Sequence, residues 1–147
     1  MHAIIIYWSL TAFTLSACVL AFAKGSTAER LAAGVILLNM ALGYLVRGLL
    51  PEFASGFKLL NDGLAATALL VLALRYTAPW LGGAMLFYAA QFALHSYFLV
   101  LNLPTTAWRG HLNNFNFAGI TCCLIAGVPV AWRRRMRLAR AAAPSAP

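Results

Sequence analysis

A chain of 147 residues with 63% hydrophobic and 10% charged residues lacks the surface of a soluble domain, because such domains carry about 25% charged residues. Its mean hydropathy of +0.81 predicts an integral membrane protein with one domain. The formal net charge is +8, but no basic patch is interleaved with exposed aromatic residues, so we expect no nucleic-acid binding.

Five apolar stretches are long enough to cross a bilayer, whose hydrocarbon core of about 30 Å needs about 20 helical residues. Because backbone groups cannot stay unpaired in lipid, we expect all five to be helices. A four-span arrangement, in which the third and fourth stretches form a hairpin that does not cross, is the alternative. We predict one all-α transmembrane domain over residues 1–140, with spans at 3–23, 31–50, 59–76, 79–103 and 112–132, and a disordered tail at 141–147.

The first span contains two short patterns that resemble processing sites. Leu15-Ser16-Ala17-Cys18 has the form of a lipoprotein cleavage box, and Ala21-Phe22-Ala23 has the form of a signal-peptidase site. No positive charge precedes them, and cleavage would leave four spans with the arginine-rich C-terminus outside. We therefore expect the first helix to be retained.

Charged side chains in the second and third spans are candidate functional groups, because each is costly in hydrocarbon. Arg47 and Asp62 each lie about 5 Å inside the outer end of their span, at a helical rise of about 1.5 Å per residue. Opposite charges at matching depth on consecutive helices predict an ion pair between them. The alternative partner of Asp62 is Lys58, four residues earlier on the same helix face.

The fourth span carries a polar stripe. Tyr88, Gln91, His95 and Asn102 follow one another at spacings that place them on one side of a helix. Since a Gln or His that faces lipid would be unsatisfied, we expect the stripe to face other helices or a wet cavity. Its candidate neighbours on other spans are Asn39, Asn113, Asn114 and Asn116.

These side chains gather in the outer half of the predicted bundle, where they have two interpretations. They either hold the helices together by hydrogen bonds of about 0.6 kcal/mol each, or line an outward-facing vestibule that binds a ligand or passes a proton, with His95 as the titrating group. The sequence leaves both interpretations open. We define the intramembrane polar cluster as Asn39, Arg47, Asp62, Tyr88, Gln91, His95, Asn102 and Asn116.

The fifth span runs directly into a basic segment that we call the arginine anchor. It consists of Arg133, Arg134, Arg135, Arg137 and Arg140. Because Lys and Arg are retained on the cytoplasmic side of a membrane, the anchor predicts a cytoplasmic C-terminus and, with five spans, an N-terminus outside. Anionic lipid headgroups at the cytoplasmic face are its expected partners. The predicted cytoplasmic segments hold eight of the 11 Lys and Arg residues, the others being Arg47, Lys58 and Arg109.

The sequence contains no constellation typical of catalysis or of a metal site. Only three residues are acidic, which is too few for a carboxylate cage. Cys18, Cys122 and Cys123 lack the Cys-x-x-Cys spacing of metal ligands, so we predict that they pack as small apolar residues. His95 is the one histidine predicted inside the membrane, whereas haem b between helices takes two axial ligands. We therefore expect neither enzymatic activity nor a cofactor.

Four segments carry a resemblance to other proteins: Thr27 to Gly34, Asn61-Asp62-Gly63-Leu64, Leu72 to Tyr76 leading to Trp80, and Gln91-x-x-x-His95. Through them, residues 27–100 resemble a loose group of short bacterial inner-membrane proteins that carry no assigned function. The resemblance implies a bacterial inner-membrane location and no particular activity.

Since no soluble domain or catalytic constellation is visible, we predict a non-catalytic accessory or assembly subunit. It would act through helix–helix contacts in the membrane, with a membrane protein partner or in a homo-oligomer. The alternative is a small transporter or channel with an outward-facing polar vestibule around His95, in which a homo-oligomer would supply any path that one protomer lacks.

Overall fold

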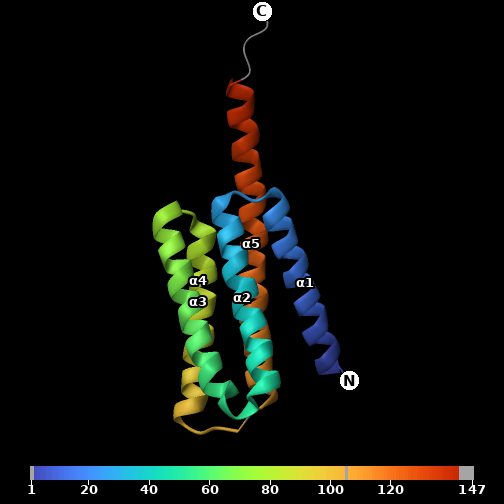
Figure 1. The fold of residues 1–147 in the computed structure, drawn as a ribbon, viewed down its shortest axis with the longest axis vertical. Helices are drawn as coiled ribbons and strands as arrows, with labels where there is room; N and C mark the ends of the chain where they lie inside the picture. The colour runs from blue at the N-terminus through green and yellow to red at the C-terminus, as the bar shows by residue number, and fades with distance from the viewer. Residues whose placement is uncertain (1, 105, 143–147) are drawn as a thin grey trace, which may run out of the picture.

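The computed structural model describes residues 2–104 and 106–142, which form a bundle of antiparallel helices (Figure 1). All five α-helices in these ranges are long and apolar enough to cross a membrane. The prediction of an all-α bundle with five such helices is therefore confirmed. The elements are α1 (His2–Lys24), α2 (Thr27–Leu49), the 3-10 helix η1 (Pro51–Phe53), α3 (Ala54–Tyr76), α4 (Pro79–Val100) and α5 (Ala107–Ala142).

The two ends of the bundle differ in chemistry. We call one the basic end, where the α1–α2 turn, the α3–α4 turn and the extension of α5 lie together (Figure 1). The opposite end, which holds η1 and the α4–α5 connection, is the η1 end. At the basic end the guanidinium of Arg135 donates a hydrogen bond to the backbone carbonyl of Lys24. The arginine anchor therefore begins where α1 ends.

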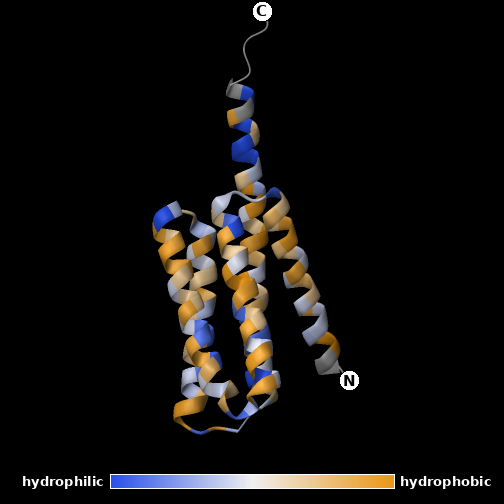
Figure 2. Ribbon diagram, viewed as in Figure 1, coloured by the Kyte–Doolittle hydropathy of each residue, from blue (hydrophilic) through white to orange (hydrophobic). Residues whose placement is uncertain are grey.

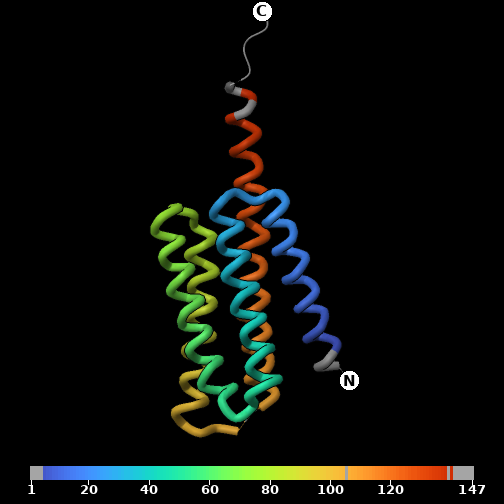
Figure 3. The backbone as a smooth tube through the Cα atoms, viewed as in Figure 1, coloured from blue at the N-terminus to red at the C-terminus, as the bar shows by residue number. Residues whose placement is uncertain are grey.

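Several helix boundaries differ from the predicted spans. The second helix begins at Thr27 and the fifth at Ala107, where the predicted spans begin at 31 and 112. Pro51 opens η1, and α3 follows immediately at Ala54. The fourth helix ends at Val100, because Asn102 has a φ of 49° in the left-handed region, which Asn tolerates better than most residues. The fifth helix continues past the other four (Figure 3), because Arg, Ala, Met and Leu are strong helix formers. The predicted tail lies outside the described residues from 143 onward, while 141 and 142 belong to α5.

The α1–α2 turn is held by a capping box. Glu29 is buried, and its Oε2 accepts hydrogen bonds from the hydroxyl of Ser26 and, at 2.8 Å, from the Ser26 backbone N–H. This satisfies donors that a helix N-terminus otherwise leaves unpaired. Gly25 precedes the cap, and a Cβ built on it would lie 2.3 Å from the carbonyl oxygen of Ala21. The turn therefore requires glycine at this position.

The apolar core fills the half of the bundle toward the basic end. Ala17, Cys18 and Ala21, which belong to the two processing-like patterns, are buried there within the continuous helix α1. The largest fully buried apolar side chains between the other helices include Ile36, Leu69, Leu81, Ile120 and Leu124. The buried Asn, Gln, His and Asp side chains lie toward the η1 end, where Figure 2 shows hydrophilic residues on the inner helices.

Close contact between α4 and α5 depends on small residues of α5. A Cβ added to Gly119 would lie 2.5 Å from Cζ of Phe87, and one added to Gly127 would lie 2.5 Å from Cε2 of Trp80. Large rings on α4 thus lie directly on the glycine backbone of α5. This packing brings the polar stripe of α4 against the start of α5.

Candidate functional site

The centre of the site is a contact between α3 and α4. The imidazole Nδ1 of His95 lies 2.6 Å from Oδ2 of Asp62. Both side chains are only 2% exposed. A carboxylate at this depth needs a partner, because an uncompensated charge in a low-dielectric interior is strongly unfavourable.

The second helix supplies the other hydrogen-bond partner of the Asp62 carboxylate. Asn39 Nδ2 donates to Asp62 Oδ1 at 3.3 Å. The Asn39 side-chain oxygen in turn accepts a hydrogen bond of 3.3 Å from the hydroxyl of Tyr88. The neighbouring Asn61 donates at 2.7 Å to the backbone carbonyl of Asn39. Three helices are therefore joined by one network in which each buried group has a partner.

The fifth helix joins the network through Asn113. Its side-chain Oδ1 lies 3.1 Å from Nε2 of His95 and accepts a hydrogen bond of 3.0 Å from Nζ of Lys58. Because a lysine ammonium only donates, the Asn113 atom in this contact must be the oxygen. His95 Nε2 must therefore also donate to that oxygen.

These contacts fix the proton content of the His95–Asp62 pair. Each ring nitrogen faces an oxygen acceptor, so each of the two contacts needs a hydrogen. Neutral imidazole supplies only one. The pair must hold one further proton, on either His95 Nδ1 or Asp62 Oδ2. It is then neutral as a whole, whichever atom carries the proton.

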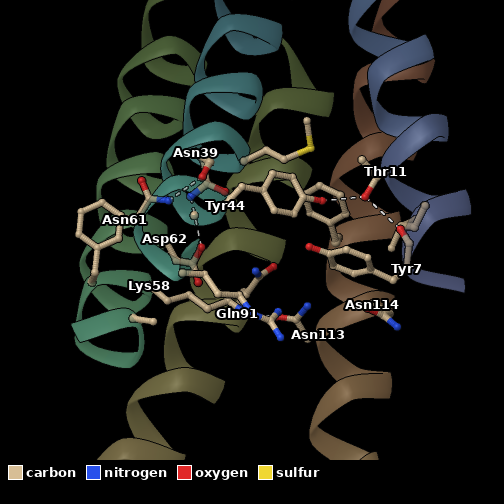
Figure 4. Close-up of a pocket in the computed structure, with 17 residues that line it drawn as sticks. Tyr7, Thr11, Asn39, Tyr44, Lys58, Asn61, Asp62, Gln91, Asn113 and Asn114 are labelled. Atoms are coloured by element: carbon tan, nitrogen blue, oxygen red, sulfur yellow. Dashed lines mark hydrogen bonds between the residues drawn. The ribbon is translucent and has the colours of Figure 1, made fainter. Parts of the chain in front are cut away.

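A cavity of about 160 Å³ lies beside this network and is lined by residues from all five helices. Figure 4 shows Lys58, Asp62, Gln91 and Asn113 gathered on one side, with Tyr7 and Thr11 of α1 across from them. Thr11 Oγ1 and the Tyr44 hydroxyl are 2.8 Å apart and link α1 to α2 at this level. The side chain of Arg47 also lines the cavity.

One buried group on the cavity wall has no partner. Gln91 is 4% exposed, and its Oε1 is the buried side-chain polar atom that finds no hydrogen bond among the described residues. An acceptor left in this state costs about 1–3 kcal/mol. Gln91 lines the cavity with other atoms, because Oε1 itself has almost no surface open to a water-sized molecule.

A second cavity, of about 330 Å³, lies on the other side of His95 at the η1 end. Its lining includes Ser55, Phe98, Asn102 and Arg109. The guanidinium of Arg109 lies 4.9 Å from the centre of the Phe98 ring, which is a cation–π distance. Since His95 lines this cavity and Asp62 lines the first, the pair lies between the two.

The structure corrects the predicted partner of Asp62. The ion pair recorded for Asp62 among the described residues is with His95, and neither Arg47 nor Lys58 forms one with it. Arg47 is exposed and lines the cavity, whereas Lys58 donates to Asn113. The physical reason is that α4 presents a buried imidazole directly to the carboxylate, so that no long cation is needed there.

The other members of the intramembrane polar cluster divide into two groups. Asn39, Tyr88 and Gln91 lie with Asp62 and His95 around the cavity or its network. Asn102 lies in the exposed turn after α4 and lines the second cavity together with His95. Asn116 is buried on α5, but the oxygen that faces His95 belongs to Asn113, about one turn earlier.

Sequence reasoning missed three contributors. Asn61 belongs to the segment Asn61-Asp62-Gly63-Leu64, but nothing in the sequence indicates that it donates to the backbone of α2. The hydrogen bond between Thr11 and Tyr44 could not be predicted, because the sequence shows only two hydroxyl side chains in neighbouring spans. Lys58 was considered only as a partner of Asp62, although a lysine side chain also reaches a neighbouring helix.

The site offers no cage for a metal ion. Among residues 2–104 and 106–142, no three or more His, Cys, Asp or Glu side chains gather as metal ligands would. The chain matches no protein-family model, no curated protein and no solved structure. Its function must therefore be argued from the polar network and the cavity.

Proposed function

We propose that the protein is a non-catalytic, multi-pass subunit of a bacterial inner membrane that binds a small polar ligand in the cavity, which we call the vestibule. The single observation that carries this proposal is a cavity wall that holds Arg47, Lys58 and Gln91, the last with no hydrogen bond recorded for its side chain among the described residues. A purely adhesive cluster is expected to satisfy its buried groups. The network around Asp62 does so, whereas the vestibule wall does not.

The proposed orientation places the η1 end outside and the basic end in the cytoplasm. The arginine anchor, Lys24, Arg30 and Arg75 belong to the basic end, by their places at the ends of the helices. This distribution follows the positive-inside rule. Anionic headgroups are then the partners of the anchor, and the vestibule faces outward.

Binding is favoured over transport by the composition of the inner half of the bundle. Leu69, Leu81, Ile120 and Leu124 are fully buried between the vestibule and the basic end. A continuous path for a polar solute would have to pass this apolar layer, where it would lose its hydrogen bonds with water. We therefore propose that occupancy of the vestibule is sensed by a membrane protein partner through helix–helix contacts.

A pair of glycines allows a direct test of the vestibule. Gly43 lines it, Gly34 lies nearer the basic end of the same helix, and a Cβ added to either residue meets no atom within 4 Å. Each is replaced by Cys in a background without Cys18, Cys122 and Cys123. A membrane-impermeant methanethiosulfonate reagent is then added to intact cells.

Gly43→Cys should react, and Gly34→Cys should not. Thermal unfolding in detergent checks that both variants fold. An unreactive Gly43→Cys in a folded protein, or equal reaction at both positions, would overturn the proposed vestibule.

A further inference from the structure

The charges on the vestibule wall indicate which ligands it selects, provided that the proposed vestibule exists. Arg47, Lys58 and Asp62 are the Lys, Arg, Asp and Glu residues in its lining. The hydrogen bonds of His95 require its pair with Asp62 to be neutral as a whole. Two cations thus face the vestibule with no net negative charge opposite them.

Neither cation is fully satisfied by the residues that the structure describes. The Lys58 ammonium has three donors, and the structure records one hydrogen bond for it, to Asn113. Arg47 forms no ion pair among the described residues. Cations that line one concave surface attract anions and raise their local concentration. The vestibule is therefore built to take a negative charge.

We propose that the vestibule binds a small oxyanion, whose anionic oxygens are bound by Lys58 and Arg47. Phosphate, sulfate and short carboxylates share this chemistry.

The first experiment measures charge selectivity with the full chain in proteoliposomes. Gly43→Cys is treated with an anionic reagent (sulfonatoethyl methanethiosulfonate) and a cationic one (trimethylammonioethyl methanethiosulfonate), each rate being normalised to that of a free thiol. We expect the anionic reagent to react about ten-fold faster or more, and Lys58→Gln to lower this ratio. A ratio near one with both reagents reacting overturns the anion proposal alone. Failure of both reagents to react overturns the vestibule as well.

The second experiment tests oxyanion binding by protection of Gly43→Cys against labelling. Phosphate, sulfate and propionate are compared at an ionic strength held constant with chloride. We expect at least one of the three to slow labelling, the most effective one identifying the ligand class, and Lys58→Gln to remove the effect. No protection from any of them overturns the proposal.

Discussion

His95 and Asp62 meet at 2.6 Å between α3 and α4, and both are almost completely buried. The pair is closed on one side by Asn39 and on the other by Asn113. Asn39 donates to Asp62 and Asn113 accepts from His95, and these hydrogen bonds stabilise a pair that would be costly alone in the interior of a bundle. This contact fixes the relative rotation of the helices that form the vestibule wall.

A double-mutant cycle should identify His95 as the partner of Asp62. Asp62→Asn and His95→Gln share one contact, so their losses of unfolding free energy should differ from additivity by about 0.5–3 kcal/mol. Asp62→Asn with Arg47→Gln is the matched control and should be additive, because Arg47 forms no ion pair with Asp62. Titration with sodium dodecyl sulfate in mixed micelles measures both cycles. Coupling to Arg47 and none to His95 would reverse the assignment.

The sequence predicts where the polar residues lie along the helices, because this position follows directly from helical rise. Asp62 and His95 are both expected toward one end of the bundle, and both lie toward the η1 end. Rise gives no information on how two helices are rotated against each other. Formal charge therefore favours Arg47 or Lys58 as the partner of Asp62, and nothing in the sequence indicates the contact with His95 that the structure shows.

The remaining differences have local causes. The helical spacing of Asn102 predicts a place on the stripe. In the structure α4 ends at Val100, and Asn102 itself has a left-handed conformation, so it does not continue the helix. Asn113 and Asn116 are both close to the start of α5, and only the packing of α4 on glycines of α5 decides which of them faces His95.

Gly25→Ala should destabilise the protein. The added Cβ would lie 2.3 Å from the carbonyl oxygen of Ala21 and 2.6 Å from Cβ of Glu29, so the α1–α2 turn must shift, at a cost of about 1–3 kcal/mol. Gly34→Ala is the control, since its Cβ meets nothing within 4 Å. It should raise the stability by up to about 1 kcal/mol, because Ala is the better helix residue. Similar melting temperatures for the two variants would contradict the geometry of the turn.

Reporter fusions should give opposite results at the two ends of the bundle. Alkaline phosphatase needs disulfides and is active only in an oxidising compartment. Fused after residue 147 it should be inactive, because the arginine anchor is retained in the cytoplasm. Inserted after Leu103, in the α4–α5 connection, it should be active. A green fluorescent reporter at the same two positions, which fluoresces when cytoplasmic, serves as the control. The inverse pattern would reverse the proposed orientation of every helix.

Asn113→Ala should lower the unfolding free energy more than Asn114→Ala. Its side-chain oxygen accepts from both Lys58 and His95, so its removal leaves a lysine and an imidazole donor without their acceptor. A donor left unpaired in a buried site costs about 1–3 kcal/mol, and more when it is charged. Asn114→Ala is the matched control, because Asn114 lines the same vestibule and no hydrogen bond of its side chain is recorded among the described residues. It should change the unfolding free energy by less than about 0.5 kcal/mol. Equal losses in the two variants would mean that Asn113 does not join α5 to the His95–Asp62 pair, and the neutral state assigned to that pair would lose its support.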